Sequence, residues 1–128
     1  MVNVLVTSES RYPINRSAIK TAVADFLAQK KVKNNVEISV AIVGKRKIHE
    51  LNKKYRKLDA PTDVLSFGLD NNKDFVDYSD NILRLGDVVI CWPIAIDEAV
   101  EEEMLVDDKI NELAIHGITH LLGEHHEE

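Results

Sequence analysis

Four of the five histidines lie in one stretch near the end of the chain, residues 116–126. His116 and His120 are four residues apart, so on a helix their imidazoles project from one face, about one turn apart, and can bind one metal ion together. His126 would lie on another face of an uninterrupted helix. Gly123 can end the helix in a left-handed turn and bring His126 round to the same ion. The spacing therefore predicts a metal site made of these three histidines.

Three neutral histidines are typical ligands of a catalytic zinc ion. They leave the fourth tetrahedral position open to water, whose pKa then falls to about 7. The spacing follows the metzincin pattern H-E-x-x-H-x-x-G-x-x-H, except that Gly117 occupies the position of the glutamate. That glutamate is the general base of zinc peptidases. We therefore expect one zinc ion per chain without ordinary peptidase chemistry.

Length and composition indicate a single domain that spans residues 1–128. The chain has 45% hydrophobic and 30% charged residues, which suits a soluble globular protein and not a disordered segment. It lacks a run of roughly 18 apolar residues and a basic, apolar start, so we expect a cytoplasmic protein with no membrane contact. Cys91 is the only cysteine, which excludes an intrachain disulfide. The oligomeric state stays open.

Charge is distributed unevenly along the chain. The net charge of −6 argues against non-specific binding to nucleic acid, which needs a basic surface. The segment 45–57 nevertheless has seven basic residues against the single acidic Glu50. Ile48, Leu51 and Tyr55 recur at helical spacing and predict a helix with these three side chains buried. Its basic side chains are either a solvated face or the footprint of an RNA backbone.

Apolar periodicity predicts alternating strands and helices. Strands are expected at residues 2–7, 36–43 and 82–92, with a short strand after a turn within 59–68. Helices are expected at 15–30, at 45–57, from Pro93 with Met104 among its buried residues, and from about Asp107 into the histidine segment. The first strand–helix–strand unit implies a right-handed parallel crossover. Asn15 can cap the first helix, Gly86 indicates a bulge or a close backbone approach in the last strand, and residues 69–81 are predicted to be a loop.

The final helix is expected to be largely buried. Its broad apolar face consists of Ile110, Leu113, Ala114, Ile118 and Leu121. His116 and His120 lie along the edge of that face, so the metal would sit in a cleft against the sheet, where metal-activated water works best. By contrast, the acidic residues of the third helix are interpreted as a solvated face and His49 as an exposed helical residue. Asp63 fits a structural role in a self-bonded turn.

Four sequence blocks occur together in a specific order. They are LNKKYR at 51–56, PTDVLSF at 61–67, LGDVVIC at 85–91 and the histidine segment at 116–126. With these blocks the chain resembles the YbeY family of bacterial endoribonucleases and ribosomal RNA maturation factors. The resemblance implies an α+β fold with a small mixed, mainly parallel four-stranded sheet packed by helices. It also implies a metal site on the C-terminal helix, with zinc held by His116, His120 and His126. Arg56 matches an arginine of the family pattern.

The resemblance further implies a zinc-dependent, single-strand-specific endoribonuclease, a hydrolase that acts on phosphodiester bonds. Such an enzyme would act in maturation of small-subunit ribosomal RNA and in ribosome quality control, with ribosomal RNA and small-subunit proteins as partners. Arg56 would pair with phosphate oxygens as negative charge builds, beside the catalytic zinc ligands His116 and His120. No residue of the sequence identifies itself as the general base. The alternative is a non-catalytic assembly factor with a structural zinc site.

One departure from the family pattern affects the third ligand. The family usually reads Gly-Tyr-Asp-His where this chain has Gly123-Glu124-His125-His126. His125 therefore replaces an aspartate and can compete with His126 for the metal.

Overall fold

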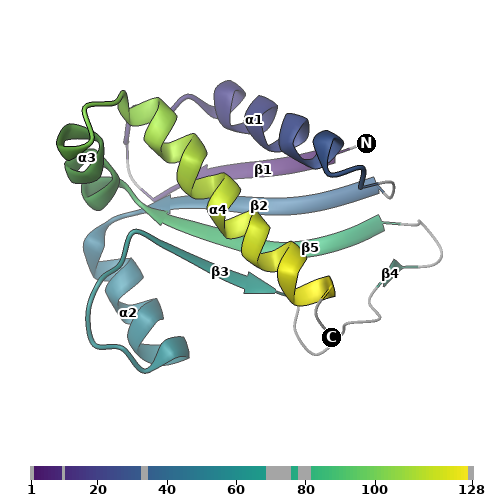
Figure 1. Cartoon of the computed structure of the whole chain (residues 1–128). Coiled ribbons are helices and arrows are strands. Elements are labelled where there is room, and N and C mark those ends of the chain that lie inside the picture. Colours follow the sequence, from purple (N-terminus) through teal and green to yellow (C-terminus); the bar gives the residue numbers. More distant parts are fainter. Residues whose placement is uncertain (1, 10, 33–34, 69–75, 78–81, 127–128) are drawn as a thin grey trace.

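One mixed sheet forms the centre of the fold in the computed structural model (Figure 1). The structure describes residues 2–9, 11–32, 35–68, 76–77 and 82–126, and for 76–77 and 124–126 it describes the backbone alone. Within these ranges the strands are β1 (Val2–Ser8), β2 (Asn35–Val43), β3 (Val64–Gly68), β4 (Val76–Asp77) and β5 (Ile82–Cys91). Their order is β1-β2-β5-β3, with the short β4 beside β5.

The sheet is mixed, as predicted. β1 pairs with β2 and β2 with β5 in parallel, whereas β3 and β4 pair with β5 in antiparallel. The four predicted strands are thereby confirmed. The two-residue β4 is an addition, because it lies in the segment 69–81 that we predicted to be a loop; the remainder of that segment is outside the described residues.

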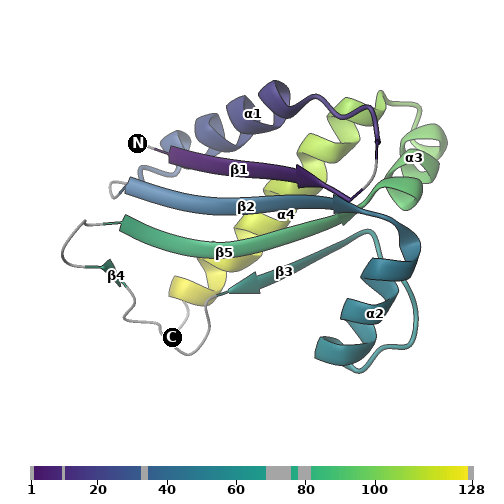
Figure 2. The ribbon, with the colours of Figure 1, turned by 180° about the vertical axis from the view of Figure 1, so that it is seen from behind.

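Four helices pack around the sheet in the described part of the chain. They are α1 (Arg16–Gln29), α2 (Lys45–Arg56), α3 (Trp92–Glu101) and α4 (Val106–His126). α1 and α4 lie across one face of the sheet, while α2 packs on the opposite face, as the two opposite views show (Figures 1 and 2). None of these helices is long and apolar enough to cross a lipid bilayer.

The alternation of β2 explains why both faces are covered. Val36, Ile38, Val40 and Ile42 are buried in the core beneath α1 and α4. Val43 points the other way and joins a smaller core around Ile48 of α2. A strand buried on both faces reads as a nearly continuous apolar run, as predicted for its latter half.

Local signals place two elements where the sequence predicted them. The Asn15 side chain caps α1 by accepting a hydrogen bond of 3.0 Å from the Ala18 backbone N–H. Gly86 has a φ of +133°, and the pairing of β5 with β2 shifts register beside it, which confirms the predicted bulge. A Cβ at Gly86 would stand 2.1 Å from the Phe67 carbonyl oxygen, so only glycine fits there.

The predicted burial of Tyr55 is wrong. Ile48 is fully buried, but 56% of Tyr55 is exposed. α2 extends past the β3 edge of the sheet (Figure 1), so the last turn of α2 meets β3 only through Phe67 and most of Tyr55 stays exposed. Helical periodicity finds the face on which Tyr55 lies, but it cannot say where the opposing sheet ends.

The predicted helix end at Gly123 is also wrong in this structure. α4 continues through Gly123 to His126. A glycine is compatible with a helix as well as with a left-handed turn, and a Cβ at Gly123 would meet nothing within 4 Å. The side chains of His125 and His126 lie outside the described residues, so the third ligand stays a prediction.

Candidate active site

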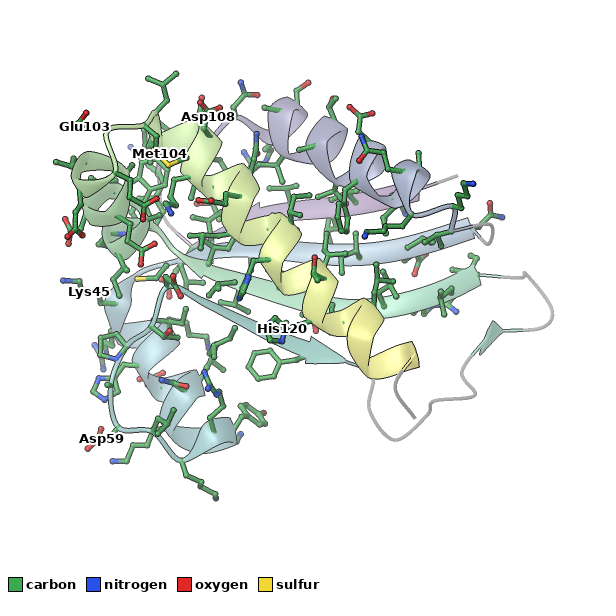
Figure 3. The ribbon with its side chains drawn as sticks, in the orientation of Figure 1. Lys45, Asp59, Glu103, Met104, Asp108 and His120 are labelled. Atoms are coloured by element: carbon green, nitrogen blue, oxygen red, sulfur yellow. The ribbon has the colours of Figure 1, made fainter. Side chains whose placement is uncertain are left out.

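A cavity of about 970 Å³ lies between α2, the segment leading into β3, and the C-terminal half of α4. Its lining includes five side chains with chemistry to offer: Arg56, Asp63, Asp87, His116 and His120. In Figure 3, His120 lies beneath α4 and beside β3. The structure therefore brings to one cavity the three residues that the sequence predicts to be catalytic, namely Arg56, His116 and His120.

The two histidines on α4 form the pair that their spacing predicts. The ring centroids of His116 and His120 are 4.8 Å apart with an interplanar angle of 65°. Both side chains are exposed and line the cavity. Among the residues whose side chains are described, no three of His, Cys, Asp and Glu gather as a metal-holding group. Two imidazoles are thus placed together, and a complete metal site needs a further ligand.

Gly117 sets how closely α4 approaches the sheet. It is buried, and a Cβ at this position would stand 2.7 and 2.9 Å from the two methyl groups of Val88 on β5. No glutamate side chain fits where the metzincin pattern has its general base. The glycine that stands in place of the metzincin glutamate thus has a packing reason.

Gly117→Ala is expected to destabilise the protein although alanine favours helix formation. The propensity gain is at most about 1 kcal/mol, while overpacking against a fully buried valine costs about 1–3 kcal/mol. The matched control is Gly123→Ala, because its Cβ meets nothing within 4 Å and the variant should be neutral or slightly stabilised. Urea denaturation of the metal-free proteins measures both changes. Equal stabilisation by the two substitutions would contradict this packing account.

Asn52 fixes the chain between Arg56 and Asp63. Asn52 is buried, and its side-chain amide donates a 2.8 Å hydrogen bond to the Ala60 backbone carbonyl. The backbone carbonyl of Asn52 accepts a hydrogen bond from the Leu58 N–H. These bonds fold the chain back after α2. The sequence analysis missed this role of Asn52, because its partners lie beyond the helix end.

Asp63 joins the cavity to the core of the sheet. Its backbone carbonyl accepts a 2.9 Å hydrogen bond from the Cys91 N–H, and its carboxylate accepts one of 3.4 Å from the neighbouring Thr62 hydroxyl. The Thr62 and Asp63 side chains thus bond to each other as predicted, but residues 61–63 form no hydrogen-bonded backbone turn. The carboxylate also lines the cavity, which the turn signal alone did not predict.

Asp87 is a second carboxylate of the cavity that sequence reasoning missed. It directly follows the bulge at Gly86 and is exposed within the otherwise apolar run Leu85–Cys91. The sequence signal that could have identified Asp87 as a site residue is its place as the one acidic residue inside a buried strand. It marks the place where the sheet opens into the cavity.

Asp63 is in contact with a network of charged side chains on α3 and α4. Burial, followed by the hydrogen bond and the charge of Asp63, raises the pKa of Glu98 to about 7, and the nearby Lys109 acts in the opposite direction. The buried Lys109 ammonium lies 2.7 Å from Glu112, 2.9 Å from Glu102 and 3.8 Å from Glu98. Hydrogen bonds from Glu112 and Glu102 raise the Lys109 pKa. Part of the acidic face predicted to be solvated thus binds a buried cation.

Glu98 is expected to make the protein less stable as the pH rises. The pKa of Glu98 is 4.5 in the unfolded chain and about 7 in the folded protein. Between these two pH values the folded protein therefore holds a proton on Glu98 that the unfolded chain has released. Each rise in pH within that window therefore lowers the free energy of unfolding. Glu98→Gln keeps a hydrogen-bond donor for Asp63 without the charge, so its stability relative to the wild type should increase from about pH 5 to about pH 8.

Glu101→Gln is the matched control for this measurement, because Glu101 is exposed on the same helix. Urea denaturation at several pH values would measure both variants. If the free energy of unfolding of Glu98→Gln and of the wild type had the same pH dependence, a raised pKa of Glu98 in the folded protein would be excluded.

His49 does not belong to the cavity lining. Its Nε2 lies 2.6 Å from an Asp59 carboxylate oxygen, and this hydrogen bond, with help from Lys53, lowers the pKa of Asp59. His49 is a residue of α2, as interpreted, with 42% of its side chain exposed.

The fold and the cavity together define a class of protein: a small α+β protein with a histidine pair on its last helix, facing an arginine-bearing cavity at a sheet edge. The sequence model of one family, described as Endoribonuclease YbeY, matches residues 6–128. The chain belongs to the YbeY family.

Similar proteins agree with this assignment. An endoribonuclease YbeY of Roseiflexus castenholzii is 37% identical over 127 residues, covering 99% of this chain and 80% of the relative. One from Acinetobacter baumannii is 37% identical over 114 residues, covering 89% and 72%. A solution structure of a Thermotoga maritima protein superposes with a TM-score of 0.61 at 27% identity, covering 94% of this chain and 72% of that one.

Proposed function

We propose that this protein is a metal-dependent endoribonuclease that cleaves single-stranded RNA and acts in maturation of small-subunit ribosomal RNA and in ribosome quality control. The observation that carries the proposal is the shared cavity of His116, His120 and Arg56. The family description supports RNA as the substrate and endonucleolytic cleavage as the reaction.

The donor set of the cavity fits zinc. Paired imidazoles four residues apart on a helix are typical zinc ligands, and their rings are 4.8 Å apart. His126 is the proposed third ligand, with His125 as its competitor. The chemistry that a bound zinc ion supplies is polarisation of a phosphoryl oxygen and a lowered pKa of water.

Arg56 provides the part of the site that needs no metal. Its guanidinium is planar and permanently charged, so it can hold two phosphate oxygens at once and stabilise the charge that builds during cleavage. It stands on the last turn of α2, whose basic residues attract the RNA backbone.

Asp63 and Asp87 are the carboxylates of the cavity lining and therefore the candidates for proton acceptor. Either could take the proton of the attacking hydroxyl. Attack by a ribose 2′-hydroxyl leaves a cyclic phosphate, and products with only 5′-phosphate and 3′-hydroxyl ends would exclude that route.

A second candidate is a non-catalytic assembly factor that binds ribosomal RNA or a small-subunit protein through α2. In this case the zinc ion would only stabilise the fold. The observation that favours this candidate is the run of exposed basic side chains on α2, which can bind RNA without cutting it. In that case metal removal would lower stability without removing a specific cleavage.

Metal removal tests the proposed function. The wild type is expected to cut an unstructured RNA but not the same strand in a duplex, to lose this activity on chelation, and to regain it with zinc. Bound zinc should also raise the melting temperature, because it binds the folded protein alone. Cleavage that persists after chelation would contradict the proposal, and RNA binding without cleavage at any zinc concentration would favour the assembly factor.

A further inference from the structure

Tyr55 is an exposed aromatic residue at the cavity. It lies on the last turn of α2, directly before Arg56, and both residues line the cavity. More than half of the tyrosine, 56%, is open to solvent. A large ring so exposed contributes little to the core, which leaves its surface available to a ligand.

The ring is nevertheless held in place. Phe67 of β3 also lines the cavity, and its ring centroid is 5.2 Å from that of Tyr55 at an interplanar angle of 64°. This edge-to-face contact orients the tyrosine although most of it is exposed. A fixed ring loses little conformational freedom when a flat ligand stacks on it.

Positive charge lies over one face of the same ring, which leaves the other face for a ligand. The Lys54 ammonium is over the Tyr55 ring, 5.1 Å from its centroid, and Arg56 follows in the chain. A flat, apolar surface flanked by cations matches the chemistry of a nucleotide, which joins an aromatic base to a phosphate. An apolar peptide would leave both cations without partners.

Only an unpaired base can use such a platform. In a duplex each base is stacked between its neighbours, whereas a single strand can present a base face to an aromatic side chain. We propose that Tyr55 is a stacking platform for one unpaired nucleobase of RNA, with Lys54 at the adjoining phosphate. This inference rests on the proposed function and supplies its preference for single strands.

Binding of a ten-residue oligoadenylate, alone and annealed to its complement, tests the platform. Tyr55→Leu should bind the single strand about tenfold more weakly, the usual order of one lost base stack, and bind the duplex as the wild type does. Tyr55→Phe should bind both like the wild type, because it keeps the ring. Leu58→Ala is the control for an exposed apolar residue nearby, since Leu58 is 48% exposed and does not line the cavity.

The salt dependence separates stacking from charge. Tyr55→Leu should keep the wild-type slope of log affinity against log salt, whereas Lys54→Ala should reduce it by roughly one phosphate contact. Melting curves check that each variant is folded, and a gel checks that the strand is intact after the measurement.

Unchanged single-strand affinity of Tyr55→Leu, or an equal loss for single strand and duplex, would overturn the platform. If the wild type cleaves RNA and Tyr55→Leu binds it equally well, the platform alone fails. If the wild type neither binds nor cleaves RNA, the proposed function fails and the platform fails with it.

Discussion

Arg56→Ala is expected to lower kcat/KM for RNA cleavage by about 10²–10³-fold, the usual effect of removing one preorganised donor from a developing charge. Arg56→Lys should recover only part of this loss, because lysine keeps the charge but cannot grip two phosphate oxygens at once. Zinc content should not change in either variant. Single-turnover cleavage of an unstructured RNA, with zinc measured in the same samples, checks all three expectations.

Arg46→Ala is the matched control, since it removes the same side chain from the same helix. Arg46 is 94% exposed, pairs with Glu50 at 3.7 Å and does not line the cavity. It should change cleavage only slightly, through weaker attraction of RNA. Equal losses in Arg46→Ala and Arg56→Ala would mean that Arg56 acts through the general charge of α2 and not at the reacting phosphate.

His120→Ala is expected to lower cleavage by on the order of 10³-fold or more, because the Lewis acid of the proposed site supplies several kcal/mol of transition-state stabilisation. The exposed side chain should be removable without loss of the fold, since the core contacts of α4 come from Ile118 and Leu121. Circular dichroism and cleavage assays on the same preparation separate the two effects.

His49→Ala is the control for this substitution. His49 pairs with Asp59 and lies outside the cavity lining, so its loss should leave cleavage and zinc content unchanged. A similar drop in both variants would point to a non-specific effect of losing a histidine.

Signals that act over one or two turns of the chain predicted most of the fold. The Asn15 cap, the alternation in β2 and the glycine of the β5 bulge each have a local cause, and each is present. The histidine pair was predictable for the same reason, because a spacing of four residues on a helix settles which side chains meet. The family blocks then predicted Arg56 as a site residue, and it lines the cavity.

Features that depend on distant partners were missed. The exposure of Tyr55 follows from where the sheet ends, and the burial of Asn52 follows from how the chain returns after α2. The link from Asp63 through Glu98 to Lys109 joins the segment before β3 to the consecutive helices α3 and α4. No periodicity or short motif records such contacts.

Gly123 illustrates a local signal with two outcomes. The sequence allowed a turn that brings His126 to the metal, whereas the structure has a continuous helix to His126. On that helix His116 and His126 lie on different faces. If His126 completes the site, α4 must therefore end earlier when the metal is bound.

The most direct test of the metal-dependent nuclease site is to measure bound zinc and cleavage rate on the same preparations of the wild type and of four variants. The variants are His116→Ala, His120→Ala, His125→Ala and His126→Ala. Our account predicts about one zinc per chain in the wild type, a cleavage rate that follows the bound zinc, and loss of both in the first two variants and in whichever of the last two removes the third ligand. Wild-type cleavage rates in zinc-free variants, or no cleavage by fully loaded wild type, would contradict it.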